Sequence, residues 1–281
     1  MSSLLPIRLF CSDLDGTLTG PAPALPFAEA WRRIPRASRP LLVYSTGRLM
    51  EDARVWIEAC GLPRCDFLIS GVGTAIHDLR RDRELGAFAR RFVRGWDAAA
   101  VRTCVRTEPG IVPQARRFRR RYKSSWHWPG AQEADLGRLR RRLEAAGVRA
   151  TVVYSHWRDL DVLPAGAGKG AALAWLCRRL RVPLESVLVA GDSGNDAAMF
   201  ALPGVRALAM PDAEPILRQV HPGGTAFYRA TAQGAAGVVA GLKAHGLFTP
   251  GRSAAAAEKR SRRPALRGRE PSPPAGACRR G

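Results

Sequence analysis

The sequence lacks three features that would identify whole classes of protein. It has no run of about 18 or more apolar residues, the length that a membrane-spanning helix requires. Its first residues lack a basic region followed by a long apolar stretch and a small-residue cleavage site, the pattern of a secretory signal. Its six cysteines include no Cys-x-x-Cys pair of the kind found in zinc and thiol redox sites. We therefore expect a cytoplasmic protein without a membrane partner, whose cysteines are reduced and mostly buried.

Acidic residues are also scarce, since 24 Asp and Glu stand against 45 Lys and Arg and give a formal net charge of +21. Such a charge often indicates a polyanionic partner. Arginine, however, exceeds lysine throughout the chain, and basic residues are densest in residues 116–121 and in a tail, residues 249–281. The tail is rich in Ala, Pro, Ser and Arg, so we expect it to be disordered. Since aromatic and basic residues alternate in only one short segment, we expect no nucleic-acid partner.

Apolar strand-like runs alternate with amphipathic segments, which is typical of an α/β fold with a mostly parallel sheet. Strands are expected over residues 7–12, 41–45, 67–70 and 187–190, and helices over residues 27–34, 49–59 and from 169 onward. Between about residues 80 and 163 the pattern changes to long basic helices and short aromatic strands. In that segment we expect helices over residues 86–103 and 135–146, and strands over residues 122–128, 152–155 and 159–163.

These patterns predict a Rossmann-like core, residues 1–79 and 164–248, with a mostly parallel sheet and an inserted α+β cap domain, residues 80–163. Trp126 and Trp128 alternate onto one face of an expected cap strand, so we assign them to the core of the cap. His127 and His156 lie on strand-like segments of the cap. We interpret them as structural or solvent-facing side chains rather than as catalytic bases.

Two glycine-rich loops do not indicate nucleotide binding. Residues 165–171 contain Lys169, but Gly170 follows it where a phosphate-binding P-loop requires a hydroxyl residue. Residues 71–74 resemble a dinucleotide fingerprint only in part, because Ile76 stands where the third glycine is needed. The sequence therefore favours neither an ATPase nor a dehydrogenase.

Polar residues follow the ends of several expected strands. Asp13 and Asp15 come directly after the first strand, Thr46 closes the second, and Asp192 follows the strand over residues 187–190. Asp and Gly are common turn formers, so Asp13 and Asp15 alone could mark a simple turn. Lys169 begins a helix, a position that disfavours a cation and so calls for a special reason. Because ligands bind at the carboxyl ends of strands in open α/β sheets, we expect these side chains to converge.

In order and spacing, these residues resemble the four motifs of the haloacid dehalogenase-like phosphatases. The motifs appear as Asp13-x-Asp15-Gly-Thr, Thr46, Lys169 and Gly-Asp192-Ser-Gly-Asn195-Asp196. The resemblance is most specific to the sucrose-phosphate phosphatase branch, whose blocks match residues 45–48, 159–170 and 191–196. It covers about residues 7–248 and implies a cap inserted between the second and third motifs.

The resemblance implies hydrolysis of a sugar phosphomonoester through an aspartyl-phosphate intermediate. Asp13 would be the nucleophile, and Asp15 would protonate the leaving sugar oxygen and later deprotonate the attacking water. Thr46 and Lys169 would hold the phosphoryl oxygens as charge shifts.

The resemblance also implies a Mg²⁺ ion, because a carboxylate and a phosphate dianion must meet in this chemistry. Asp13, the backbone carbonyl of Asp15 and Asp192 would provide hard oxygen ligands for it. Asn195 and Asp196 would orient these groups from behind the ligands.

The substrate is less specified than the reaction. The matching blocks place Gly47, Arg48, Gly73 and Thr74 next to the substrate. Sucrose phosphatases typically carry Glu where this chain has Ala75, so a partner for a sugar hydroxyl is missing.

We expect sucrose 6-phosphate first, with mannosylfructose phosphate, glucosylglycerol phosphate or another phosphosugar as alternatives. The chain could also pair with a glycosyltransferase or synthase. A catalytically silent partner domain of such a synthase is a second alternative, and the complete set of motifs argues against it. A nucleic-acid binder that uses the basic tail, residues 249–281, is a third.

Overall fold

The computed structural model describes residues 5–20, 23–118, 120–221 and 227–248. Residues Met1–Phe248 form one compact unit. The expected disordered tail, residues 249–281, lies outside the described residues. Within the described ranges, no helix has the length and apolar character needed to cross a membrane.

An eight-stranded sheet with the order β12-β11-β10-β1-β2-β3-β4-β5 forms the centre of this unit. Neighbours from β12 to β3 are parallel, whereas β4 pairs antiparallel with both β3 and β5. The strands are β1 (Leu9–Ser12), β2 (Leu41–Ser45), β3 (Phe67–Ser70), β4 (Ala75–Asp78), β5 (Arg83–Glu84), β10 (Val187–Gly191), β11 (Arg206–Ala209) and β12 (Phe227–Arg229). The predicted α/β fold with a mostly parallel sheet is confirmed.

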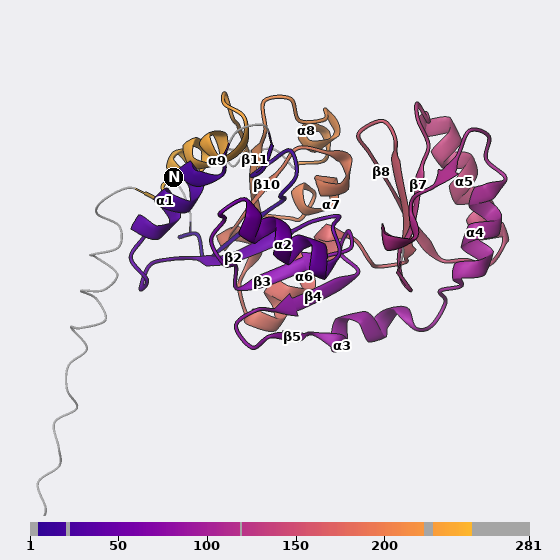
Figure 1. Cartoon of the computed structure of the whole chain (residues 1–281), viewed down its shortest axis with the longest axis horizontal. Coiled ribbons are helices and arrows are strands. Elements are labelled where there is room, and N and C mark those ends of the chain that lie inside the picture. The colour runs from indigo at the N-terminus through magenta and orange to yellow at the C-terminus, as the bar shows by residue number, and fades with distance from the viewer. Residues whose placement is uncertain (1–4, 21–22, 119, 222–226, 249–281) are drawn as a thin grey trace, which may run out of the picture. The chain divides into compact units, whose positions relative to one another are not determined.

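Helices cover both faces of this sheet (Figure 1). Successive residues of a strand point to opposite faces, so Cys11 of β1 packs toward one set of helices and Phe10 toward another. The helices on the Cys11 face are α3 (Gly86–Ala89), α6 (Lys169–Leu180), α7 (Ala197–Phe200) and α8 (Ile216–Val220). Those on the Phe10 face are α1 (Leu25–Arg33), α2 (Met50–Ala59) and α9 (Gly234–Ala244). Because both faces are covered, the central strands are continuous apolar runs.

A second, antiparallel sheet with the order β6-β7-β9-β8 lies between α3 and α6 in the chain. Its strands are β6 (Val112–Pro113), β7 (Ser124–His127), β8 (Ala150–Ser155) and β9 (Asp159–Pro164). Helices α4 (Ala98–Arg106) and α5 (Glu133–Ala145) lie side by side against it, as Figure 1 shows. Trp126 and Trp128 are buried in its core as predicted. The inserted α+β element is thus present, while its boundaries at residues 80 and 163 stay a prediction.

The expected helix over residues 86–103 is wrong, because two helices separated by a turn occupy that range. Helix α3 is followed by a 3-10 turn, Arg90–Phe92, and α4 begins only at Ala98. Gly95 has a φ of 84°, a left-handed conformation that ends helical geometry. Asp97 then caps α4, since its carboxylate accepts the backbone N–H groups of Ala99 and Ala100 at 2.8 and 3.0 Å. The helical spacing of apolar residues continues through Gly95 and Asp97, so it did not reveal the break between the two helices.

Candidate active site

The acidic turns converge at one edge of the parallel sheet, as predicted. Strand β1 lies between β10 and β2, and the three run in the same direction. Asp13, Thr46 and Asp192 each directly follow the last residue of one of these strands. Because the carboxyl ends of parallel strands meet at one edge, residues far apart in the sequence become neighbours.

Lys169 joins two carboxylates inside the protein. Its Nζ lies 2.9 Å from Oδ1 of Asp13 and 2.7 Å from Oδ1 of Asp196, and its side chain is 0% exposed. The two carboxylates hold the pKa of Lys169 above its usual value in spite of burial. They also explain how a lysine is accommodated in the first turn of α6, where a cation is otherwise disfavoured.

Asp196 belongs to a 3-10 turn, η4 (Gly194–Asp196), which follows β10. Its Oδ2 accepts the backbone N–H groups of Asp192 and Ser193 at 3.1 and 3.3 Å. Gly191 permits this arrangement, since a Cβ there would stand 2.6 Å from the Asp196 carboxylate. Asp196 thereby holds both Lys169 and the backbone that carries Asp192, while its role in orienting metal ligands stays a prediction.

Two residues that follow Asp15, Gly16 and Thr17, lie against the carboxylate of Asp192. The hydroxyl of Thr17 donates to its Oδ1 at 2.8 Å. A Cβ on Gly16, whose φ is 80°, would lie 2.5 Å from its Oδ2. Gly16 therefore has two reasons to be glycine, a left-handed backbone and the close approach of a carboxylate.

Carboxylate oxygens of Asp13, Asp192 and Asp196 all lie within 4.8 Å of one another. Lys169 is a buried cation that contacts two of these three carboxylates, so acidic groups are in excess in the cluster. Burial is the main cause that raises the pKa of Asp13 well above its usual value and the pKa of Asp196 above its usual value. Neighbouring carboxylates raise both pKa values further. A divalent cation would neutralise this excess, and the all-oxygen donor set fits a hard cation. The carboxylate of Asp15 is not a member of the cluster.

Asp15 instead forms a two-pronged ion pair with Arg48. Nε and Nη2 of Arg48 each lie 2.8 Å from an oxygen of Asp15, and the two side chains are 31% and 45% exposed. The guanidinium also lies over the ring of Trp56, 4.2 Å from its centre. Hydrogen bonding to Asp15 raises the pKa of Arg48 above its usual value. Both predicted residues are therefore at the solvent-facing rim of the carboxylate edge.

The remaining predicted residues shape the loops around this edge. Thr46 is fully buried, and its Oγ1 accepts the backbone N–H of Arg48 at 3.1 Å. Gly73 lies against the start of α6, because its carbonyl accepts the N–H of Gly168 at 3.3 Å and a Cβ would stand 2.2 Å from Gly168. Thr74 donates its hydroxyl to the carbonyl of Gly71 within the same loop.

Asn195, another predicted site residue, has a side-chain oxygen without a hydrogen-bond donor in the described part of the chain. Its Oδ1 is buried and accepts no hydrogen bond from the described part of the chain. Buried polar atoms are normally paired. An unpaired acceptor beside Asp196 is suited to a donor from a bound ligand or water.

The sequence patterns indicated no contact for Thr17 or Glu214, and they indicated a structural or solvent-facing His156. Thr17 lies within the first motif, so a hydroxyl two residues after Asp15 was the available signal. His156 is 48% exposed, but its Nε2 lies 3.6 Å from Oδ2 of Asp192, and that carboxylate raises its pKa against the effect of burial. His127 pairs with Asp159 at 2.8 Å within the second sheet, as a structural histidine would.

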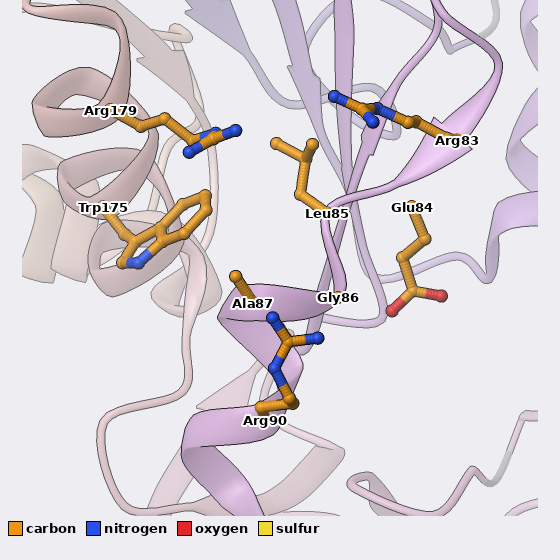
Figure 2. A pocket seen from close by; sticks show the side chains of 8 residues that line it. All are labelled: Arg83, Glu84, Leu85, Gly86, Ala87, Arg90, Trp175 and Arg179. Carbon is orange, nitrogen blue, oxygen red and sulfur yellow. The ribbon is translucent and has the colours of Figure 1, made fainter.

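A separate pocket lies at the other end of α6. It is lined by Arg83 and Arg90 and, from α6, by Trp175 and Arg179, which Figure 2 shows on the side opposite Arg83. Ten residues of helix separate Lys169 from Arg179, which corresponds to about 15 Å along the axis. The arginine-lined pocket is therefore not part of the carboxylate cluster.

Comparison with known proteins places this geometry in a family. The family model described as sucrose-6F-phosphate phosphohydrolase matches residues 6–246. A mannosylfructose-phosphate phosphatase from Agrobacterium fabrum is 40% identical over 243 residues, which are 86% of this chain and 98% of that protein. Sucrose-phosphatase 1 from Nicotiana tabacum is 32% identical over 224 residues, 75% of this chain, and the chain spans 52% of its length.

Solved structures agree with this assignment. The sucrose-phosphatase from Synechocystis sp. PCC6803, solved with sucrose and phosphate, has a TM-score of 0.78 and 25% identity over 87% of this chain and 100% of that chain. A sugar phosphatase of haloacid dehalogenase subclass IIB shares the fold, with a TM-score of 0.60 and 13% identity over 86% of this chain and 100% of that chain. The chain therefore belongs to the sucrose-6F-phosphate phosphohydrolase family, phosphoric monoester hydrolases of the haloacid dehalogenase-like superfamily.

Proposed function

We propose that the chain is a Mg²⁺-dependent phosphatase that removes the phosphoryl group from a phosphorylated disaccharide. The cluster of Asp13, Asp192 and Asp196 around Lys169 is the observation that carries this proposal. It combines a buried nucleophile, a fixed cation and an excess of negative charge that a divalent cation would balance. These are the components that phosphoryl transfer needs.

Asp13 and Asp192 would hold the ion, together with the backbone carbonyl of Asp15. Bound Mg²⁺ would neutralise the negative charge of the phosphoryl oxygens. Asp196 and Asn195 would keep the ligand loop in place, since Asp196 already accepts the backbone N–H of Asp192.

The reaction proceeds in two displacements in this proposal. A carboxylate oxygen of Asp13 forms a bond to phosphorus while the bond from phosphorus to the sugar oxygen breaks, and Asp15 gives that oxygen a proton. Water then attacks the phosphorus and loses a proton to Asp15, which releases inorganic phosphate and restores Asp13. Lys169 and the hydroxyl of Thr46 hold the phosphoryl oxygens through both steps.

Arg48 contacts both carboxylate oxygens of Asp15 in the structure. The ion pair is partly exposed, so its net contribution to stability is about 1 kcal/mol or less. It is therefore weak enough to part when a substrate oxygen approaches Asp15. Arg48 would then be free to meet the phosphosugar.

For the substrate, we place mannosylfructose phosphate first. This chain spans 98% of the mannosylfructose-phosphate phosphatase from Agrobacterium fabrum. It is 40% identical to that protein and 32% identical to the tobacco sucrose-phosphatase. Sucrose 6-phosphate, first by sequence motifs alone, is the second candidate, which the family description and the Synechocystis structure support.

The test is phosphate release from mannosylfructose phosphate, sucrose 6-phosphate, glucosylglycerol phosphate and glucose 6-phosphate, each with Mg²⁺ and with chelator. We expect turnover that requires Mg²⁺, the highest kcat/KM on mannosylfructose phosphate, and none in Asp13→Asn. Highest kcat/KM on sucrose 6-phosphate would reverse the order of the two candidates. No turnover on any of the four would contradict the proposal and favour a silent partner of a synthase.

A further inference from the structure

The turn between β8 and β9 brings the second sheet to the Asp192 loop. The backbone N–H of Arg158 donates to the carbonyl of Ser155 at 3.2 Å, which closes a four-residue turn. Strand β8 packs against η4, the 3-10 turn that follows Asp192. A Cβ on Gly194 would lie 2.4 Å from the carbonyl oxygen of Tyr154, so only glycine permits this approach.

The two central residues of this turn have unfavourable backbone conformations. His156 and Trp157 have φ values of 55° and 52°, the φ pattern of a type I′ turn. Asn, Asp and Gly are the residues that such turns prefer, because a Cβ is strained at positive φ. Backbone strain of this kind clusters at functional sites, so the turn is a candidate for a functional role.

A ring of contacts links this turn to Asp192. The backbone N–H of Glu214 donates to the carbonyl of Asp192 at 2.7 Å. The Oε1 of Glu214 accepts the backbone N–H of His156, also at 2.7 Å. The ring closes where Nε2 of His156 lies 3.6 Å from Oδ2 of Asp192. Asp192 is thus held through Oδ1 by Thr17 and faced at Oδ2 by a residue of the second sheet.

We propose that the turn Ser155–Arg158 is a latch that fixes the Asp192 carboxylate, with His156 as its positioning residue and Glu214 as its anchor. This inference rests on the proposed function, because it takes Asp192 to be a metal ligand. Its role is to couple the position of the second sheet to the ligand loop. His156 keeps its strained backbone because glycine, which would relieve the strain, has no side chain to face Asp192.

A matched pair of variants separates positioning from turn structure. His156→Gly and Trp157→Gly each relieve one positive φ in the same turn. Trp157 is 64% exposed, and its side chain makes no hydrogen bond or ion pair with Asp192 in the part of the chain that the structure describes. Because glycine tolerates a positive φ, both variants of the full chain should keep or raise the melting temperature. Only His156→Gly should weaken Mg²⁺ binding, measured by titration calorimetry without substrate, by about 10-fold. It should lower kcat with a smaller effect on KM.

Glu214 supplies a second, independent test. Glu214→Ala removes the acceptor for the His156 amide, so NMR should show faster hydrogen exchange at that amide together with weaker Mg²⁺ binding. Glu214→Gln keeps a side-chain oxygen and should restore both towards the parent values.

Equal Mg²⁺ affinity in the parent, His156→Gly and Trp157→Gly would overturn the role of His156. Unchanged exchange at the His156 amide in Glu214→Ala would overturn the anchor. If the parent chain itself bound no Mg²⁺, both the proposed function and the latch would fail, whereas weak binding in His156→Gly and Trp157→Gly alike would remove the latch alone.

Discussion

Asp13→Asn should make the metal-free protein more stable while it abolishes turnover. The substitution removes one of three clustered carboxylate charges and changes the shape of the side chain very little. Asp13 attracts Lys169 across 2.9 Å, which corresponds to about 6 kcal/mol at an effective dielectric constant of about 20. It also repels Asp192 and Asp196 at 4.8 Å or less, about 3.5 kcal/mol for each. The loss of repulsion therefore exceeds the loss of attraction by about 1 kcal/mol.

Burial strengthens this expectation, because a neutral amide has a lower desolvation cost than a carboxylate. The assay is urea unfolding at pH 7.5 in chelator and again in saturating Mg²⁺. We expect Asp13→Asn to be about 1–2 kcal/mol more stable than the parent in chelator, and to gain less stability from Mg²⁺. Asp82→Asn is the control, since its ion pair with Arg54 is exposed and should contribute about 1 kcal/mol or less.

A lower stability of Asp13→Asn in chelator would refute this reasoning. It would show that the attraction of Lys169 outweighs the repulsion within the cluster. The cluster would then have no electrostatic need for a divalent cation, whatever the catalytic result.

Three other predictions concern Asp15, Gly16 and His221. Asp15→Asn should lower kcat about 10²- to 10⁴-fold in the phosphate-release assay, with a stability change below about 1 kcal/mol because its ion pair is partly exposed; unchanged kcat would exclude Asp15 as acid and base. Gly16→Ala should cost about 1–3 kcal/mol more in urea unfolding than Gly61→Ala, because both have positive φ but only the first Cβ meets Asp192. Burial lowers the pKa of His221 from about 6.5, so below that pH the unfolded chain takes up a proton that the folded chain does not. The free energy of unfolding should therefore fall as the pH drops from 7.5 to 5.5. An equal fall in His221→Gln over the same range would show that His221 is not the cause.

Sequence patterns were sufficient to predict the class of fold and the residues that meet at the carboxyl ends of the strands. Apolar runs that end in Asp13, Thr46 and Asp192 required a parallel sheet whose strand ends meet, and the structure has that sheet. Periodicity, a local property, located most of the helices and strands. It failed at residues 93–97, where the positive φ of Gly95 and the Asp97 cap interrupt an apolar spacing that otherwise continues.

The pairing of these residues depends on the tertiary structure. No local pattern relates Arg48 to Asp15, or Lys169 to both Asp13 and Asp196, because such contacts depend on strand order and helix position. The ring through His156 and Glu214 is further from prediction, since it needs a turn of one sheet to reach the loop of another. Sequence motifs report the groups that chemistry requires, whereas the residues that position them are selected by packing across segments distant in the chain.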